Sequence, residues 1–196
     1  MVFSSKYFII TLVFLLFLIF GLGNNSMTLF TGKVTQSALN ITISSTASIN
    51  FSVNSIYFGP GSVDVGKNKA TIDTLGNVID GNWSSISGGF ILNNIGNSNL
   101  GLYIKSGKTA SEFIGGTNPE YYYMVRNEET NSCLDETVTF NSWIAVNTSG
   151  YGDKICSLMG YDNNNDSIRI DIKLAIPSDA LQGEREDIFT ATGISL

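Results

Sequence analysis

The sequence predicts an all-β protein: an antiparallel β-sandwich, Ig-like or jelly-roll-like, with about 8–10 strands and one N-terminal apolar helix before them. Apolar and polar residues alternate from Leu39 to Val53 and again from Ile168 to Ile176, which is the period of a β-strand. Turn-forming residues recur about every 8 to 15 residues. After residue 30, no stretch of ten residues or more has helical periodicity.

The N-terminus predicts export. One positive residue, Lys6, precedes an apolar run from Tyr7 to Gly23, and no further charge occurs before Lys33. This order is typical of a signal peptide, here with cleavage after Gly23. The run of about 17 residues is at the lower limit for crossing a bilayer, so an uncleaved membrane anchor is the alternative. In both cases Lys6 stays inside, and the rest of the chain is exported to the cell surface or beyond it.

We therefore expect three regions: residues 1–23 as a signal peptide or N-terminal membrane anchor, residues 24–38 as a linker, and residues 39–196 as a single β-sandwich domain. The chain has 11 Lys and Arg against 17 Asp and Glu. Without residues 1–23, which contain Lys6, the balance is ten against seventeen, a net charge of −7. Such a surface, with no Lys/Arg cluster, repels nucleic acid, so no nucleic-acid partner is expected.

The first predicted strand, within residues 39–53, lies in a region of 30 residues, 34–63, that contains no charge. Apolar residues move from odd to even positions at Ile56, so a bulge or bend is expected near Asn54-Ser55. A turn around residues 44–46 would instead divide the stretch into two strands. The strand is either inserted in its own sheet, which we favour because sequential strands usually pair within one domain, or donated to a neighbouring subunit.

Further segments rich in β-branched and aromatic residues predict the other strands: Ala70–Asp73, Phe90–Asn93, Leu100–Lys105, 120–127, 137–147, 167–177 and 186–196. An Asn/Gly turn joins the second and third of these. Residues 76–89 are predicted to be a loop with one strand fragment, and Trp143 is a core candidate. In the segment 167–177, Ile and Leu at even positions face the core, whereas Arg169, Asp171 and Lys173 face water.

The two cysteines, Cys133 and Cys156, both lie in the exported part of the chain. An oxidising compartment would pair them, and closing a loop of 24 residues would stabilise the fold by roughly 3 kcal/mol. The alternative is two buried free thiols.

No catalytic site is predicted. The chain has no His, which excludes Ser-His-Asp triads, Cys-His dyads and most zinc sites, and no cofactor is expected. Asp162, Asn164 and Asp166 resemble the first half of a calcium loop, but an EF-hand needs Gly at 167 and Glu at 173 where this chain has Ser and Lys. We favour a polar hairpin turn over a small Ca²⁺ site there. Tyr121, Tyr123 and Trp83 are candidates for an aromatic ligand platform.

N-glycosylation sequons begin at Asn24 and at five asparagines of the exported region, Asn40, Asn50, Asn82, Asn147 and Asn165. Asn40 and Asn50 both fall on the polar face of the first predicted strand. These asparagines are candidate glycan acceptors in an exported protein.

Three segments carry a resemblance to known proteins: INFSVNSIYFGPGSV, FILNNIGNSNLGLYI and IRIDIKLAIPSDALQGEREDIFTATG. In this order they resemble small exported β-sandwich proteins of archaeal surfaces, of unknown function, and are more distantly similar to TasA/camelysin-type filament subunits. In those subunits a signal, an uncharged first strand and a strand, Asn-x-Gly turn, strand unit recur, which here correspond to residues 7–23, 39–53 and 90–104 around Asn94 and Gly96. The resemblance implies assembly by passing an N-terminal strand to a neighbour.

We expect a non-enzymatic, exported cell-surface structural or interaction protein that is anchored singly or assembles through N-terminal strand exchange. Its partners would be further copies or other cell-surface proteins, and the membrane through residues 7–23 if these are uncleaved. An extracellular ligand- or glycan-binding or adhesion module is the alternative. A hydrolase would need a carboxylate pair assembled from distant loops and is the least supported hypothesis.

Overall fold

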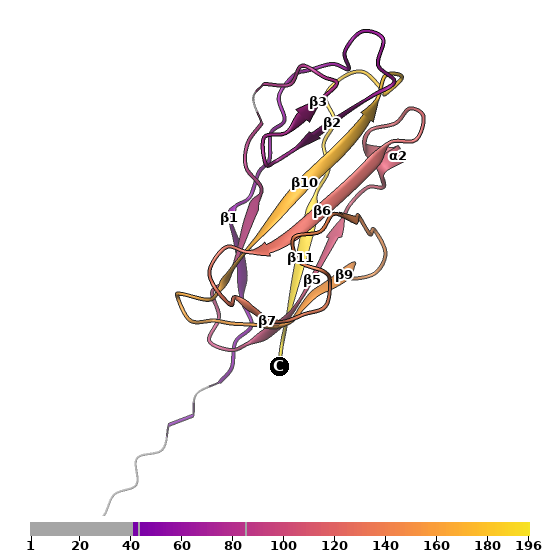
Figure 1. Ribbon diagram of the computed structural model, residues 1–196. Helices are drawn as coiled ribbons and strands as arrows, with labels where there is room; N and C mark the ends of the chain where they lie inside the picture. Colours follow the sequence, from indigo (N-terminus) through magenta and orange to yellow (C-terminus); the bar gives the residue numbers. More distant parts are fainter. Residues whose placement is uncertain (1–40, 43, 85) are drawn as a thin grey trace, which may run out of the picture. The chain divides into compact units, whose positions relative to one another are not determined.

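The computed structural model describes residues 41–42, 44–84 and 86–196, and the fold is that of the unit Ile43–Leu196. In the described residues, eleven strands form two antiparallel sheets, and helix is limited to one turn, α2 (Ala110–Phe113) (Figure 1). The predicted all-β class with antiparallel sheets is confirmed. The predicted N-terminal helix, the signal peptide or anchor (1–23) and the linker (24–38) lie outside the described residues.

The larger sheet is built around one long central strand, β10. It contains seven strands: β1 (Ile49–Val53), β2 (Lys69–Asp73), β3 (Val78–Ile79), β4 (Phe90–Asn94), β6 (Glu120–Asn127), β8 (Ile144–Ala145) and β10 (Ser167–Pro177). β6 pairs along one side of β10, and β4 and then β2 pair along the other side. The strands β1, β3 and β8 are its edges.

The smaller sheet has the order β11-β5-β9-β7, with bounds β5 (Leu100–Ser106), β7 (Cys133–Glu136), β9 (Asp153–Met159) and β11 (Phe189–Ser195). Along the chain from β4 to β11, successive strands alternate between the larger and the smaller sheet. The predicted strands at 90–93 and 100–105 are therefore present but unpaired with each other, because the Asn/Gly turn between them crosses from one sheet to the other.

Both sheets contribute side chains to one hydrophobic cluster. The even-numbered apolar residues of β10 face this cluster, as the alternation predicted, and meet residues of β5 and β9 such as Leu102 and Ile155. Burial of each such side chain stabilises the fold by roughly 1.5–3 kcal/mol. The two sheets therefore share one core, which contains buried residues of β2, β4, β6 and β10 from the larger sheet and of β5, β7 and β9 from the smaller sheet.

Two sequence-based expectations were wrong in detail. Residues 137–147 form a strand only at β8, and Trp143 is half-buried against Lys173 instead of lying in the core. The strands β7 and β9 were not predicted. β7 has only four residues, and the register shifts on both sides of β9 go with a burial pattern that does not alternate. Within the described part of the chain, no helix is long and apolar enough to cross a membrane.

Candidate functional site

β1 is an edge strand that pairs with β4 alone among the described strands. Its Ile49 and Phe51 pack against the core, whereas Asn50 and Ser52 are exposed, so the predicted alternation is present here. A register shift lies between Phe51 and Val53, two residues before the predicted bend. The apolar positions therefore change from one face of the strand to the other, as expected, and β1 is part of the sheet of its own chain.

The residues just before β1 are fixed by the turn that follows β4. The N–H of Ile95 donates to Ser48 O (2.9 Å), and the N–H of Asn97 donates to Thr46 O (3.2 Å). The Asn97 side chain extends this ladder: its Oδ1 accepts from the Thr46 N–H (2.6 Å), and its Nδ2 donates to Ser44 O (3.0 Å). A side-chain amide thus replaces a peptide group of a neighbouring strand. We call residues 44–53 the N-terminal segment, and β4 with residues 95–97 the acceptor edge.

The shape of the acceptor edge depends on Asn94 and Gly96. Asn94 is buried, its Nδ2 donates to Ser98 O (3.0 Å) and Gly160 O (2.8 Å), and its Oδ1 accepts from the Gly96 N–H (3.1 Å). A Cβ on Gly96 would overlap Thr46 O, so the N-terminal segment approaches this closely only because residue 96 is Gly. Sequence reasoning singled out Asn94 and Gly96, but not Asn97.

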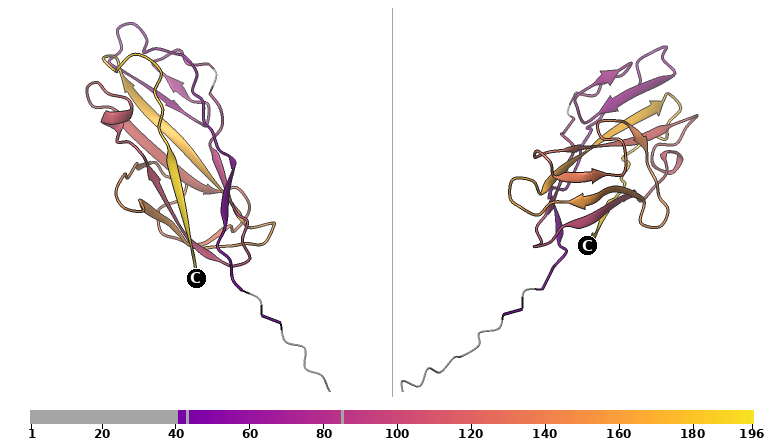
Figure 2. Two further views of the ribbon diagram at one scale, coloured as in Figure 1. Left: turned by 180° about the vertical axis from the view of Figure 1, so that it is seen from behind. Right: turned by 60° about the horizontal axis from the view of Figure 1, so that its bottom comes forward.

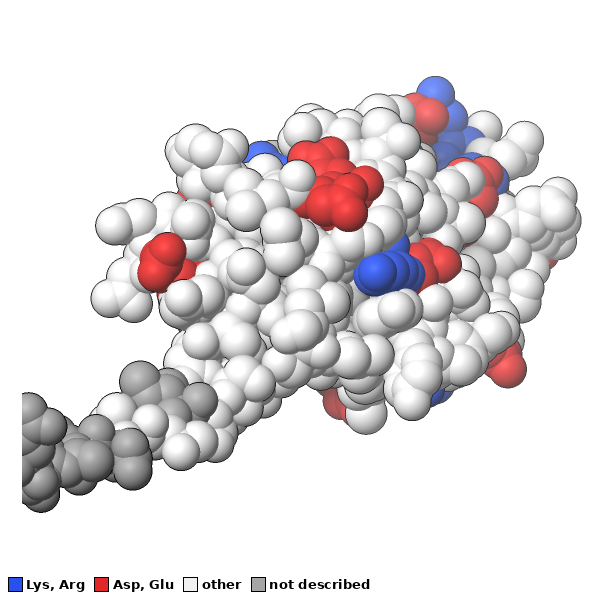
Figure 3. Space-filling view, turned by 90° about the horizontal axis from the view of Figure 1, so that it is seen from below, with Lys and Arg blue, Asp and Glu red and all other residues white. Residues whose placement is uncertain are grey.

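β1 lacks the features that protect β3, β7 and β8, which are three other edges of the described sheets. β3 and β8 have two residues each, and β7 carries Asp135 and Glu136. β1 has five residues with neither a charge nor a Pro. Figure 3 shows the end of the molecule near the C-terminus, where most of the visible surface is uncharged and the acidic residues form separate groups. Unprotected edges of this kind favour the addition or exchange of strands.

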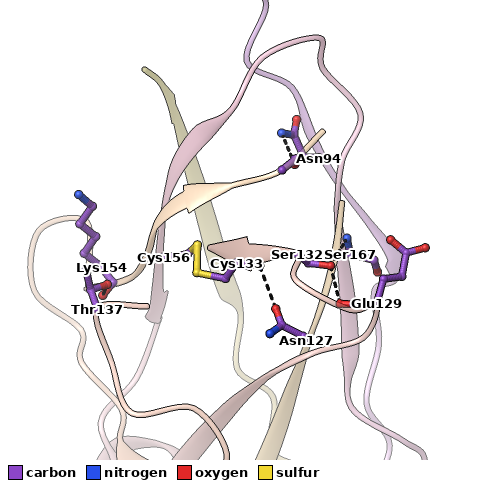
Figure 4. The surroundings of a disulfide bond; sticks show 10 residues. Asn94, Asn127, Glu129, Ser132, Cys133, Thr137, Lys154, Cys156 and Ser167 are labelled. Carbon is purple, nitrogen blue, oxygen red and sulfur yellow. Dashed lines mark hydrogen bonds between the residues drawn. A yellow bond between two sulfur atoms is a disulfide. The ribbon is translucent and has the colours of Figure 1, made fainter. Parts of the chain in front are cut away.

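The predicted disulfide is confirmed. Cys133 of β7 and Cys156 of β9 are bonded, with Cα atoms 5.9 Å apart and both residues buried (Figure 4). The N–H of Cys133 donates to Asn127 Oδ1 (2.9 Å), and Ser132 Oγ accepts from the Ser167 N–H (3.2 Å). The bond therefore ties the edge strand β7 to the core, and side-chain bonds join the segment before it to the larger sheet.

The candidate glycan acceptors differ in accessibility. Asn50 and Asn82 are exposed, and Asn82 Oδ1 accepts from the Ser62 N–H (2.7 Å), which leaves its Nδ2 free of protein partners among the described residues. Asn147 donates from Nδ2 to Asp153 Oδ1 (2.9 Å), and Asn165 is half-buried. Asn24 and Asn40 lie outside the described residues. Glycosylation at these positions stays a prediction.

The predicted calcium-like stretch, Asp162, Asn164 and Asp166, lies between β9 and β10, which belong to different sheets, so it is not a hairpin turn. The Asp166 N–H donates to Glu129 Oε2 (3.0 Å). Burial, and then the Glu129 charge, raises the pKa of the Asp166 carboxyl. The residues that the structure describes contain no group of three or more His, Cys, Asp or Glu arranged to hold a metal ion.

The candidate aromatic platform is not assembled. Tyr121 and Tyr123 are buried, and their hydroxyls donate to Asp187 Oδ2 (3.0 Å) and Asp153 Oδ2 (2.7 Å). Burial raises the pKa of both tyrosines. Trp83 packs against Gly61 and Gly81. These three side chains therefore belong to separate environments and offer no common face to a sugar ring.

On the outer face of the larger sheet, Tyr122 and Trp143 contact the Lys173 ammonium, whose Nζ lies 4.6 Å and 4.8 Å from the ring centroids. Tyr122 points away from its two neighbours, as the alternation predicted. Because Lys173 occupies the faces of both rings, this aromatic pair is engaged within the protein.

A charge cluster around one buried carboxylate lies on the same outer face and was not predicted. Asp171, expected to face water, is 0% exposed. Its carboxylate lies 2.9 Å from Arg126 Nε and 3.3 Å from Arg169 Nε, and accepts from Thr74 Oγ1 (2.8 Å). The backbone at Gly89 passes so closely that a Cβ there would lie 2.6 Å from Asp171 Oδ1. The cluster joins β10 to β6 and to the end of β2, which is a structural role.

Comparisons with known proteins give no family for this chain: no protein-family model, no curated protein and no solved structure matches it. Its function is therefore inferred from the N-terminal segment and the acceptor edge.

Proposed function

We propose that this chain is an exported cell-surface structural or interaction protein whose subunits assemble by exchanging the N-terminal segment. The disulfide supports export, because such bonds form and persist in oxidising compartments. The charge-poor start of the chain, with its apolar run at residues 7–23, supports the same location as a signal peptide or anchor.

One observation carries the assembly part of the proposal: the acceptor edge holds residues 44–48 through backbone groups and through the Asn97 amide, which binds backbone atoms only. Backbone contacts do not depend on which chain supplies the segment. A second copy can therefore form the same bonds and place its own Ile49 and Phe51 against the core. Exchange of an identical element between subunits needs no new interface.

The finer fold assignment belongs to the same proposal. We infer that the two face-to-face sheets form a β-sandwich, since their inner faces share one hydrophobic cluster. The resemblance of the sequence to TasA/camelysin-type filament subunits supports a sandwich that donates its first strand.

A disulfide lock tests the exchange. Asn50 and Asn93 are opposite one another on β1 and β4, so Asn50→Cys with Asn93→Cys can bridge the two strands within one chain. The oxidised double variant should stay monomeric in light scattering and show no fibres by negative stain. After mild reduction that opens only the exposed engineered bond and leaves the buried Cys133–Cys156 bond intact, it should assemble like the wild type. Asn50→Cys alone is the control for loss of the Asn50 sequon. Assembly of the fully oxidised double variant to the wild-type extent would overturn the proposal.

A deletion gives a second test. A mature chain that lacks residues 34–53 should form no polymers, because its acceptor edge is empty and it has no segment to donate. An added peptide with the sequence of residues 34–53 should fill the acceptor edge and restore the thermal stability of the deleted chain. A peptide that leaves its melting temperature unchanged would contradict backbone-based acceptance.

The alternative of a glycan-binding module has less support, because Tyr121 and Tyr123 are in the core and Tyr122 is occupied by Lys173. Specific binding of this protein to one glycan on an array, probed with and without Ca²⁺, would support this alternative.

A further inference from the structure

The smaller sheet has an unprotected edge of its own. β11 (Phe189–Ser195) pairs with β5 and with no other strand of the described residues. Its seven residues include no charge and no Pro, whereas the opposite edge, β7, is short and acidic. β1 and β11 contact each other, and Figure 2 shows them along the same side of the unit. Long uncharged edges are the ones onto which further strands add.

The direction of the unused backbone groups on β11 follows from its bonds to β5. Ile188 O accepts from the Gly107 N–H (2.9 Å), and the Leu196 N–H donates to Asn99 O (3.3 Å). In an antiparallel pair, alternate residues turn their N–H and C=O to the same side. Even-numbered residues of β11 therefore bond to β5, and the odd-numbered residues Phe189, Ala191, Gly193 and Ser195 turn theirs to the free side.

This free side is complementary to a second copy of itself. If two β11 strands meet antiparallel with Thr192 on the two-fold axis, Phe189 lies opposite Ser195 of the second copy, and Ala191 lies opposite Gly193. All four are odd-numbered, so every free N–H and C=O of the strand finds a partner, about eight hydrogen bonds in total. The two Thr192 side chains then form a close cross-strand pair, which is a favourable one.

The charges of the sheet permit this contact. Two cations lie on the outer face beside β11: Lys154 of β9, whose Cε lies close to Gly101 opposite Ile194, and Lys105 of β5, which lies opposite Thr190. In the paired arrangement, the row of cross-strand neighbours that contains Lys105 continues through Thr190 to Ile194 and Gly101 of the second copy. The two Lys105 side chains therefore lie in different rows. Two copies with net charge −6 thus meet at an edge where no like charges lie opposite each other.

We propose that the free edge of β11 is a self-association surface, at which two copies of this chain pair β11 with β11 around a two-fold axis and join their four-stranded sheets into one sheet of eight strands. This contact is independent of β1 exchange. A contact through one pair of strands is at the low end of interface size, so it is weak in solution and gains strength where copies are concentrated on a surface or in a polymer.

A cross-linking experiment with matched variants tests the register. Full-length, exported chain with its native disulfide formed is mildly oxidised as Thr192→Cys and, separately, as Thr190→Cys. Both residues lie on the outer face of β11. In the proposed register the two introduced thiols at position 192 face each other within disulfide range, whereas two thiols at position 190 are about four residues, or 13 Å, apart along the strand. Thr192→Cys should give covalent dimers at least tenfold faster than Thr190→Cys.

A second variant separates edge pairing from random collision. Ala191→Pro removes an N–H that faces the free side and takes no part in the β5 ladder, so the fold persists while the edge is blocked. In the Thr192→Cys background it should abolish the dimer. In the wild type, hydrogen exchange at Ala191 and Gly193 should slow as protein concentration rises.

Equal cross-linking of Thr192→Cys and Thr190→Cys, or exchange at Ala191 that is independent of concentration, would overturn the proposal. The disulfide lock of β1 leaves β11 untouched. If β1 exchange does not occur, the Thr192→Cys variant should still form its covalent dimer. If β11 pairing does not occur, the disulfide lock of β1 should still prevent assembly.

Discussion

Gly96→Ala is the substitution that most directly perturbs the acceptor edge. The new Cβ would overlap Thr46 O and lie 3.0 Å from Ser48 N, so the N-terminal segment must move away by roughly 1 Å to reach ordinary contact. The bonds from the Ile95 and Asn97 N–H groups, at 2.9 Å and 3.2 Å, would then exceed hydrogen-bond length.

Loss of these two backbone bonds, at roughly 0.5–1.5 kcal/mol each, predicts a decrease of about 1–3 kcal/mol in the free energy of unfolding. Urea denaturation measures the total. Hydrogen exchange shows where the stability is lost, because the amides of Ile95 and Asn97 should exchange faster while the amides of the core strand β10 stay protected. Assembly should weaken as well, since a donated segment meets the same obstruction.

The control for this prediction is Gly101→Ala on β5, where a Cβ would find its nearest neighbour at 3.6 Å, an ordinary contact. Its stability should equal or slightly exceed that of the wild type, because Ala restricts the unfolded chain. If Gly96→Ala and Gly101→Ala have the same stability, and Ile95 and Asn97 stay protected in both, the acceptor edge does not work as described.

Three further predictions concern the rest of the fold. Asp171→Asn removes the buried carboxylate from Arg126 and Arg169, both partly exposed, and should lower the free energy of unfolding in urea by about 1–3 kcal/mol, whereas a loss below about 0.5 kcal/mol would refute the role of the cluster. Replacing Cys133 and Cys156 by Ser should cost about 3 kcal/mol, and an unchanged denaturation midpoint would show that the closed loop contributes nothing. Burial and Glu129 raise the pKa of Asp166, so its protonated form is favoured on folding and the associated stability is lost as pH rises through that pKa. Asp166→Asn should therefore raise the melting temperature at pH 7 and leave it nearly unchanged near pH 3, whereas a lower value at pH 7 would contradict this sign.

Strands with a continuous local pattern could be predicted from the sequence. β10 was predicted with its observed bounds because five alternating Ile and Leu side chains and a terminal Pro specify both its face and its end. The alternation around Ile49 and Phe51 likewise predicted β1 and its buried face. Residues 44–48 continue the same pattern, yet they are not a strand, because the chain beside them offers the Asn97 side chain in place of a regular backbone ladder.

The features that sequence reasoning missed depend on contacts between distant residues. The alternation that places Asp171 away from the core is correct, but its burial comes from Arg126 on β6 and from the backbone at Gly89. The pair Gly88-Gly89 is a local signal of close backbone approach, although it does not indicate which residue approaches the backbone there. Whether neighbouring strands pair or cross between sheets is equally absent from local patterns, so the sequence predicts the β4 to β5 turn without its crossing.

The central claim is that β1 of one copy can occupy the acceptor edge of another. The most direct measurement mixes two single variants, Asn50→Cys and Asn93→Cys, under assembly conditions followed by mild oxidation. Since Asn50 and Asn93 are cross-strand partners, a disulfide between the two different chains forms efficiently only when β1 of one lies on β4 of the other. Exchange predicts a covalent heterodimer as the main product by mass spectrometry. Assembled protein that yields no such heterodimer would contradict the account.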